Sequence, residues 1–350
     1  MAELPSSRVV VVGAGVFGRN HLRIWRALED AGAPVHLVGI VEPNSSAASH
    51  LAAEYCVPVY ASTSELLRAA EPPDAASVAV PTSQHAAVTA ELLSSGVDVL
   101  VEKPFTTTLQ QADELITLAQ RHKRIVQVGH LERFNPAVRA VRSILHQPLF
   151  FEVHRLSVFT PRALDVDVIL DLMIHDLDIV LSWTQSPIRE LHAVGLPILS
   201  AKVDIANVRI EFESGCVANF TASRVSTERV RKIRFFQPHQ YVSIDYARQD
   251  VLCIDVPALQ TPELRQPTFP DLSAVAFQSV ETPHPIPGFA MRKLEISSGE
   301  PLRLELESFL RSVRERTEPK VTAQDGRAAL AVALEISAAI VAHQSRAGLA

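Results

Sequence analysis

Short apolar runs alternate with helix-like stretches along the first 130 residues of the chain. The runs are rich in Val, Ile and Leu without strict polar alternation, which is typical of strands covered on both faces of a parallel sheet. The expected strands are Val9–Val12, Val35–Val41, Pro58–Tyr60, Ser77–Val80, Val97–Val101 and Ile125–Gly129. The expected helices are Gly15–Ala31, Ser45–Tyr55, Ser64–Ala70, Ser83–Ser95 and Leu109–His122. This alternation predicts an α/β domain with a doubly wound parallel sheet over residues 1–130.

A different pattern begins after Gly129 and predicts a second domain over residues 131–350. Asn135-Pro136 provides an N-cap followed by proline at the first helical position, so we expect a helix from there to about His146. The other expected helices are Asp165–Trp183, Pro301–Arg316 and Thr322–Ser345. The expected strands are Ile188–Val194, Ala206–Phe212, Cys216–Ser226, Arg231–Gln237 and Tyr241–Asp245, with a proline-rich excursion over Pro257–Pro287. We therefore expect an α+β domain with a large, mostly antiparallel sheet.

Length, composition and charge narrow the class of protein. A chain of 350 residues is long enough for about two domains, and 47% hydrophobic against 21% charged residues indicates compact globular folding. The 33 basic and 39 acidic side chains give a net charge of −6, which argues against a nucleic-acid-binding protein. The apolar stretch Ala328–Ala342 is shorter than the roughly 20 residues of a membrane span and contains Glu335, so we expect a packed helix.

The cysteines and the N-terminus indicate the compartment. Cys56, Cys216 and Cys253 lie far apart and form no CxxC pair, so neither a disulfide framework nor a thiolate zinc site is expected. The N-terminus lacks the basic region and long apolar core of a secretory signal. We expect a cytoplasmic protein without a membrane or nucleic-acid partner.

A glycine-rich turn follows the first expected strand. Its GxGxxG pattern is formed by Gly13, Gly15 and Gly18, with Val16 and Phe17 before the last glycine. Between a strand and a helix, such glycines make a tight turn and let backbone N–H groups approach a pyrophosphate. Glu42 ends the next strand, where an acidic side chain accepts hydrogen bonds from ribose hydroxyls and repels a 2′-phosphate. These residues predict that the cofactor is NAD rather than NADP.

Three further segments follow in a characteristic order. They are Val80-Pro81-Thr82 leading to His85, Glu102-Lys103-Pro104 after the fifth strand, and Asp171-Leu-Met-Ile-His175-Asp176-Leu-Asp178. With the glycine-rich turn, they resemble the Gfo/Idh/MocA family of nicotinamide-dependent sugar and cyclitol oxidoreductases. The resemblance covers nearly the whole chain. It implies a Rossmann domain, NAD as cofactor, and cofactor contacts from Pro81, Thr82, His85, Glu102 and Lys103.

A narrower resemblance rests on Gly129–Pro136, Asp165–Asp178, and Asp204–Asn207 through Arg224. These segments are similar to those of UDP-N-acetylglucosamine 3-dehydrogenases, which make the 3-keto precursor of the 2,3-diamino sugars of lipid A. Inositol and other free-sugar dehydrogenases share the catalytic motifs and remain an alternative. A nonenzymatic nicotinamide-binding regulator is a second alternative, although it would have no need of Lys103, Asp171 and His175 together.

Oxidation of a secondary alcohol by hydride transfer requires a group that removes the hydroxyl proton. Lys103 follows a parallel strand, where ligands of doubly wound sheets bind. Asp171, His175 and Asp178 are spaced i, i+4 and i+7, so we expect them to share one face of the Asp165–Trp183 helix. We expect His175 to be the general base, as the resemblance also implies, and Asp171 to orient it. These residues are also possible metal ligands, but no second ligand cluster accompanies them, so no metal is expected.

A nucleotide sugar also needs partners for its diphosphate and hydroxyl groups. Basic residues gather between Arg224 and Arg234, although a solvated face is an alternative interpretation of such a run. The candidate substrate-binding residues are Arg133, Asn135, Arg155, Arg162, Asp178 and Arg224. Apolar residues in the broad sheet predict a homodimer or homotetramer. A 3-keto sugar product predicts functional coupling to an aminotransferase.

Overall fold

The computed structural model describes residues 6–68, 72–160, 166–256 and 290–348, and it divides into two compact units. Unit 1 consists of the residues up to Phe134 together with Ile174–Ile179 and Gly299–Glu335. Unit 2 consists of Asn135–Met173, Val180–Ser298 and the residues from Ile336 onward. Unit 1 therefore includes two segments that lie far along the chain from its parallel sheet.

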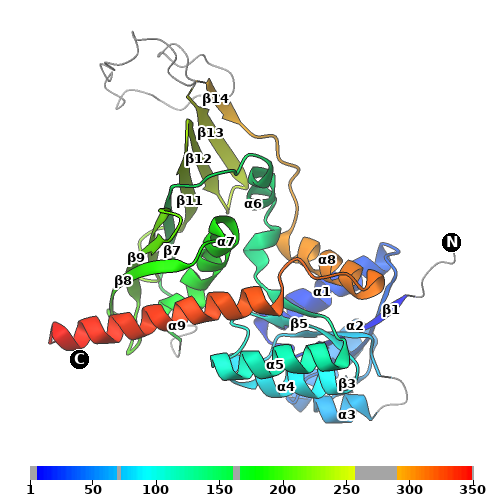
Figure 1. The fold of residues 1–350 in the computed structure, drawn as a ribbon. Coiled ribbons are helices and arrows are strands. Elements are labelled where there is room, and N and C mark those ends of the chain that lie inside the picture. Colours follow the sequence, from blue (N-terminus) through cyan, green and yellow to red (C-terminus); the bar gives the residue numbers. More distant parts are fainter. Residues whose placement is uncertain (1–5, 69–71, 161–165, 257–289, 349–350) are drawn as a thin grey trace, which may run out of the picture. The chain divides into compact units, whose positions relative to one another are not determined.

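Unit 1 is built on a six-stranded parallel sheet (Figure 1). Its order is β3-β2-β1-β4-β5-β6, with β1 Ser7–Val12, β2 Val35–Val41, β3 Val59–Tyr60, β4 Ala75–Val78, β5 Asp98–Glu102 and β6 Val126–Gly129. The intervening helices are α1 Val16–Asp30, α2 Ser45–Tyr55, α3 Thr63–Leu67, α4 Thr82–Ser94 and α5 Leu109–His122. This arrangement confirms the expected doubly wound sheet, with boundaries that differ by a few residues.

Alternate residues of β1 enter two different hydrophobic cores, which explains why the strand has no polar face. Val10 and Val12 pack in a core with Leu93 of α4 and Leu115 of α5. Val9 and Val11 pack on the other face of the sheet, in a second core. Strands of this kind are buried on both sides, as the sequence pattern predicted.

The second core receives a helix from late in the chain. Helix α8, Pro301–Glu315, places Leu306 and Phe309 beside Trp25 of α1. All three side chains are fully buried. The helix is amphipathic, as a helix that covers one face of a sheet requires. It was expected as a helix of the second domain, and the structure places it in unit 1.

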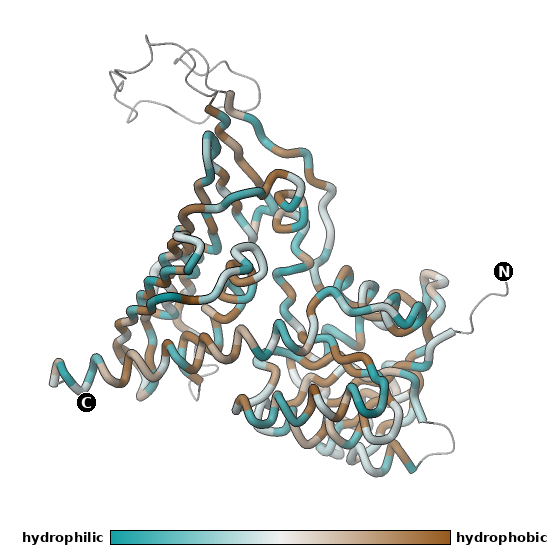
Figure 2. Tube along the Cα trace, in the orientation of Figure 1, coloured by the Kyte–Doolittle hydropathy of each residue, from teal (hydrophilic) through white to brown (hydrophobic). Residues whose placement is uncertain are grey.

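Unit 2 contains an eight-stranded sheet of order β14-β13-β12-β11-β7-β10-β9-β8. The strands are β7 Phe150–Leu156, β8 Ile188–Leu196, β9 Ile205–Phe212, β10 Val217–Ser223, β11 Val230–Gln237, β12 Gln240–Asp245, β13 Asp250–Asp255 and β14 Ala290–Lys293. Only β7 and β10 pair in parallel, which confirms a mostly antiparallel sheet. Hydrophobic and hydrophilic residues alternate along its strands (Figure 2). β7, β13 and β14 were not expected from the sequence.

The helices of unit 2 differ from expectation in two places. Helix α6 covers only Pro136–Ala140 and is followed by a 3₁₀ turn, Val141–Ser143, instead of running to His146. Helix α7 covers Ile174–Thr184 and is preceded by a π-helical turn, Ile169–Met173. The expected continuous helix is thus interrupted. Asp165 and the proline-rich excursion lie outside the described residues.

The last helix, α9, covers Ala323–Arg346. Among the described helices it alone is long and apolar enough to cross a membrane. Part of its apolar surface is already covered by protein, because Leu330, Ile336 and Ile340 are fully buried. A packed helix has the same composition, so no membrane assignment follows.

Candidate active site

The glycine-rich turn lies between β1 and α1, and two of its three glycines have a steric reason to lack a side chain. Gly13 has φ of +90°, and a Cβ atom there would lie 2.8 Å from the Ala79 carbonyl oxygen. A Cβ atom on Gly18 would lie 1.9 Å from the Gly13 carbonyl oxygen. Gly15 faces open space. Two glycines therefore allow the turn to close, and the third leaves room beside it.

The N-terminus of α1 is suited to a pyrophosphate. Gly15 is its N-cap and provides no side-chain hydrogen bond, and the first turn contains no acidic residue. Val16 and Phe17 are exposed. The first backbone N–H groups of a helix need partners from outside the helix, and the helix dipole favours an anion there. The turn therefore fits the diphosphate of a dinucleotide.

Glu42 lies directly after β2, at the edge of the same turn. Its Oε2 accepts a hydrogen bond from the Ala14 N–H at 3.1 Å, and its Oε1 accepts one from the Asn44 N–H at 2.9 Å. A carboxylate oxygen can accept a second hydrogen bond. The side chain is thus held in place by the backbone and retains acceptor capacity for ribose hydroxyls.

The loops after β4 and β5 are joined by His85. Its Nδ1 lies 2.8 Å from the Pro104 carbonyl oxygen and its Nε2 lies 3.0 Å from the Val80 carbonyl oxygen. Burial lowers the pKa of His85, whereas these two contacts and the charge of Glu102 oppose that effect. Its predicted cofactor contact remains a prediction. The exposed Pro81 and the adjoining Thr82 lie at the start of α4.

Glu102 ends β5 and Lys103 follows it. The Glu102 carboxylate is buried, and its Oε1 lies 3.0 Å from His21 Nε2 of α1. On its other side the carboxylate packs against Gly129, where a Cβ atom would lie 2.7 Å from Oε1. Glu102 is therefore a buried link between α1 and β5, and it leads into the half-buried Lys103.

Two histidines lie close together in unit 1. The ring of His175 in α7 and the ring of His130, directly after β6, have centroids 6.4 Å apart in an edge-on arrangement. Burial, with smaller contributions from the charges of Arg133 and Lys103, lowers the pKa of His130 to about 3. Lys103, His130 and His175 therefore share one neighbourhood, and His130 stays neutral. His130 lies in the segment Gly129–Pro136 that carries the narrower resemblance, but the sequence predicted no role for it.

Asp171 does not have the helical environment that its spacing predicted. It lies in the π-helical turn before α7, where each turn holds more residues than in an α-helix. The i, i+4, i+7 relation of Asp171, His175 and Asp178 is therefore not that of one α-helical face. π-helical turns are frequent at functional sites, which is compatible with the predicted role of Asp171.

Arg133 and Asp178, both predicted to bind substrate, contact each other in unit 1. Arg133 Nε lies 2.9 Å from Asp178 Oδ2, which is an ion-pair distance, but the N–H bond does not point at the oxygen as a hydrogen bond requires. Arg133 Nη2 lies 3.4 Å from Asp325 Oδ2. Burial raises the pKa of Asp178 to about 7 and outweighs the opposing effect of Arg133. Their predicted substrate contacts remain predictions, since the structure gives both charges internal partners.

The other predicted substrate-binding residues that the structure describes also have internal partners, in their case within unit 2. Asn135 caps α6 by accepting a hydrogen bond from the Ala137 N–H, and it donates one to the Tyr246 carbonyl oxygen. Arg155 is buried with its guanidinium 5.2 Å from the centre of the Tyr246 ring. Arg224 is buried in an ion pair with Asp204. Arg162 lies outside the described residues.

Glu305 of α8 is a buried acid that sequence reasoning missed. It is fully buried, and neither carboxylate oxygen makes a hydrogen bond to any of the described residues. Burial, with added repulsion from Glu102 and Asp178, raises its pKa well above the ordinary value. A glutamate in an amphipathic helix is normally assigned to the solvent side, so the sequence contains no signal for this position.

Asp178→Asn should change how stability depends on pH. The folded protein holds this proton up to about pH 7, whereas the unfolded chain releases it near the ordinary pKa of 3.8. The resulting contribution to stability is present below about pH 4 and is lost as the pH rises through about 7. Relative to the unmutated protein, the variant should therefore gain free energy of unfolding between about pH 4 and pH 8. Urea unfolding across this range measures the difference.

The matched control is Glu114→Gln, which removes an exposed carboxylate of α5. Its difference from the unmutated protein should be nearly constant with pH. A constant difference for Asp178→Asn would contradict the raised pKa.

Comparisons with known proteins match both parts of the chain. Residues 7–130 match the oxidoreductase family with an NAD-binding Rossmann fold, and residues 132–237 match the GFO/IDH/MocA C-terminal domain. A UDP-N-acetylglucosamine 3-dehydrogenase of Acidithiobacillus ferrooxidans is 32% identical over 340 residues, which cover 97% of this chain and 99% of that protein. A solved structure of that enzyme has a TM-score of 0.82 at 31% identity and covers 96% of this chain and 98% of its own.

An inositol 2-dehydrogenase/D-chiro-inositol 3-dehydrogenase of Shouchella clausii is 32% identical over 186 residues, which cover 50% of this chain and 52% of that protein. The family matches imply a nicotinamide cofactor, NAD or NADP, and oxidoreduction at a CH–OH group. Both the domain matches and the nearly full-length relative lead to the same assignment. The chain belongs to the Gfo/Idh/MocA family of oxidoreductases.

Proposed function

We propose that this protein oxidises the 3-hydroxyl of UDP-N-acetylglucosamine to the 3-keto sugar with NAD. The observation that carries the proposal is similarity over 97% of the chain to an enzyme with this activity, combined with a dinucleotide-type turn, Lys103 and His175 in unit 1. An inositol or free-sugar dehydrogenase is the second candidate. Its support is narrower, because the inositol dehydrogenase described above matches only half of the chain.

NAD fits the residues of unit 1. The N–H groups at the start of α1 would hold the diphosphate, and Glu42 would accept hydrogen bonds from the adenosine ribose. When bound, NAD accepts the hydrogen and two electrons of the carbon atom that is oxidised. The acidic Glu42 disfavours a 2′-phosphate in this position, which supports NAD over NADP.

His175 and Lys103 act on the substrate hydroxyl in this proposal. His175 takes the hydroxyl proton as the ketone forms, and a histidine has a suitable pKa range for this step. Lys103 brings positive charge to the same oxygen and favours the loss of that proton. Asp171 orients His175 or stabilises its charged form. The nonenzymatic regulator has no use for this set of residues.

The chemistry of the proposed reaction indicates which enzyme would act next. Alcohol oxidation by NAD is often unfavourable, so an aminotransferase that consumes the 3-keto product would draw the reaction forward. We propose that the protein works in the cytoplasm as a homodimer or homotetramer, in the synthesis of 2,3-diamino sugars for lipid A. The similarity to the Acidithiobacillus enzyme supports the substrate.

Glu42→Ala should weaken NAD binding by about tenfold or more, because hydrogen bonds to a charged acceptor are lost. NADP binding should be weakened less, since a repulsive charge is lost as well. Calorimetric titration with both cofactors measures the ratio. Glu54→Ala, which removes an exposed carboxylate of α2, is the control and should leave the ratio unchanged. Equal affinities of the unmutated protein for NAD and NADP would contradict the role of Glu42.

Lys103→Met and His175→Asn should each lower kcat by about 100-fold or more, as expected for the loss of acid–base groups. NAD affinity should stay within about twofold, because neither change alters the turn that binds the diphosphate. Steady-state kinetics and NAD titration measure these effects. The exposed Lys293→Met and His192→Asn are matched controls. Near-normal turnover in either test variant would remove that residue from the mechanism.

The substrate is tested with UDP-N-acetylglucosamine, free N-acetylglucosamine and myo-inositol in parallel. Each assay includes an aminotransferase that accepts a 3-keto sugar and its amino donor. Binding energy from the UDP part helps to hold the sugar in a reactive position, so free N-acetylglucosamine should be a poor substrate. NADH formation with myo-inositol but not with UDP-N-acetylglucosamine would overturn the proposal and favour the cyclitol alternative.

A further inference from the structure

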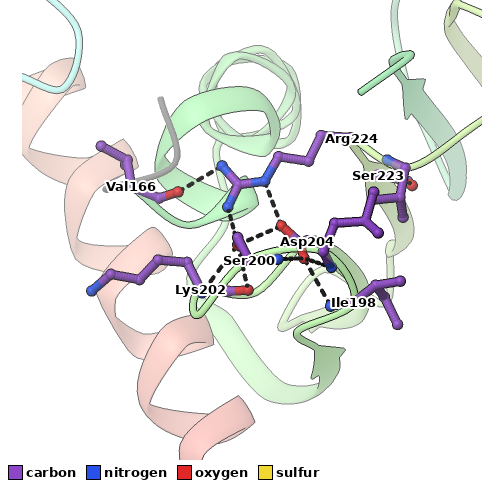
Figure 3. Close-up of polar contacts among 9 residues, drawn as sticks. Val166, Ile198, Ser200, Lys202, Asp204, Ser223 and Arg224 are labelled. Atoms are coloured by element: carbon purple, nitrogen blue, oxygen red, sulfur yellow. Dashed lines mark hydrogen bonds and ion pairs between the residues drawn. The ribbon is translucent and has the colours of Figure 1, made fainter. Parts of the chain in front are cut away.

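A buried ion pair lies beside the hairpin that connects β8 and β9 of unit 2. Asp204 precedes β9, and Arg224 follows β10 (Figure 3). Arg224 Nε donates to Asp204 Oδ1 at 2.7 Å, and both side chains are almost completely buried. Buried ion pairs contribute little net stability compared with apolar residues of the same volume. The role of this pair is therefore better understood from the segments that it holds in place than from its contribution to stability.

Asp204 organises the hairpin loop. Its Oδ2 accepts backbone N–H hydrogen bonds from Ile198 at 2.7 Å, Leu199 at 2.6 Å and Ser200 at 2.9 Å. Burial alone would raise the pKa of Asp204, but these bonds and those from the Ser200 hydroxyl and Arg224 hold it well below its ordinary value. The carboxylate is therefore ionised at neutral pH and fixes both the loop and the arginine.

Arg224 also connects the Asp204 carboxylate to a third segment, the one that contains Val166. Its Nη1 donates to the Val166 carbonyl oxygen at 2.8 Å, and its Nη2 donates to Ser200 Oγ at 3.0 Å (Figure 3). All three guanidinium nitrogens thus have partners within unit 2. The planar fork of arginine suits such a junction, whereas a lysine ammonium cannot reach three separate acceptors in this geometry.

Residues 166–168 form a segment that leads directly into the π-helical turn that contains Asp171. This segment is held at further points within unit 2. The Val168 N–H donates to the Val203 carbonyl oxygen at 3.0 Å, which attaches it to the hairpin loop again. Asp167 accepts hydrogen bonds from the Leu170 N–H at 2.9 Å and from Ser337 Oγ at 3.1 Å. The hairpin, β10 and α9 therefore all contribute to fixing this segment.

We propose that Arg224 is a positioning residue that holds the π-helical turn, and through it Asp171, in the conformation needed for catalysis. A π-helical turn has no hydrogen-bond advantage of its own over an α-helical turn, so its surroundings must select it. Arg224, held by Asp204, favours this conformation by binding the backbone carbonyl of Val166, just before the turn. The catalytic consequence rests on the function proposed above for Asp171 and His175, whereas the structural consequence does not.

Hydrogen–deuterium exchange of the full-length protein tests the structural consequence. Arg224→Lys keeps the positive charge but loses the fork, and Ser200→Ala is a milder change that keeps the ion pair. Exchange in peptides covering residues 166–173 should rise by about tenfold in Arg224→Lys and by less in Ser200→Ala. Arg209→Lys changes an exposed arginine of β9 whose Nη1 donates to Asn219 Oδ1, and it should leave the exchange unchanged.

Kinetics provide the second arm, with whichever substrate the unmutated protein oxidises. Arg224→Lys should lower kcat about tenfold, as expected for a misplaced catalytic group, while NAD affinity stays within about twofold. Unchanged exchange over residues 166–173 in both variants would overturn the proposal. An equal rise in exchange across β9 to β12 would also overturn it, because it would mean general destabilisation. If the unmutated protein oxidises none of the tested sugars, the proposed function fails, and the exchange result still decides this inference.

Discussion

The buried carboxylate of Glu102 is the constraint on which the site in unit 1 depends. A carboxylate removed from water needs hydrogen-bond partners and close packing around it. His21 of α1 lies 3.0 Å from one of its oxygens, and Gly129 leaves room for it because any Cβ there would collide with it. Helix α1 begins at the dinucleotide-type turn, and β5 ends at Lys103. One buried interaction thus couples the position of the cofactor turn to that of the proposed catalytic lysine.

The polar groups around this carboxylate give unit 1 an unusual interior. Glu305 and Asp178 are buried acids with raised pKa values, and His130 is a buried histidine with a lowered pKa. Burial is the main cause of each shift. Each group is therefore held in its neutral form more readily than in water. Lys103 is half-buried, and His175 lies beside the neutral His130 ring, so both proposed catalytic groups belong to this interior.

Sequence reasoning predicted the features that local chemistry determines. The strands of unit 1 follow from apolar runs buried on both faces, and Asn135 caps α6 as its Asn-Pro pair predicted. The π-helical turn at Asp171 was not predicted, because its residues suit an ordinary helix. Arg224 belonged to a run of basic residues in the sequence, and only the fold shows that it forms a buried ion pair with Asp204. Tertiary contacts of this kind leave no local signal in the sequence.

The central claim is that the hydrogen on C3 of the nucleotide sugar passes to NAD held by the glycine-rich turn. A label-transfer experiment tests it most directly: UDP-N-acetylglucosamine deuterated at C3 is incubated with the protein, NAD and the coupled aminotransferase, and the reduced cofactor is examined by mass spectrometry. The account predicts one deuterium atom in each NADH formed and none left at C3 of the oxidised sugar. Unlabelled NADH formed together with the oxidised sugar would contradict it.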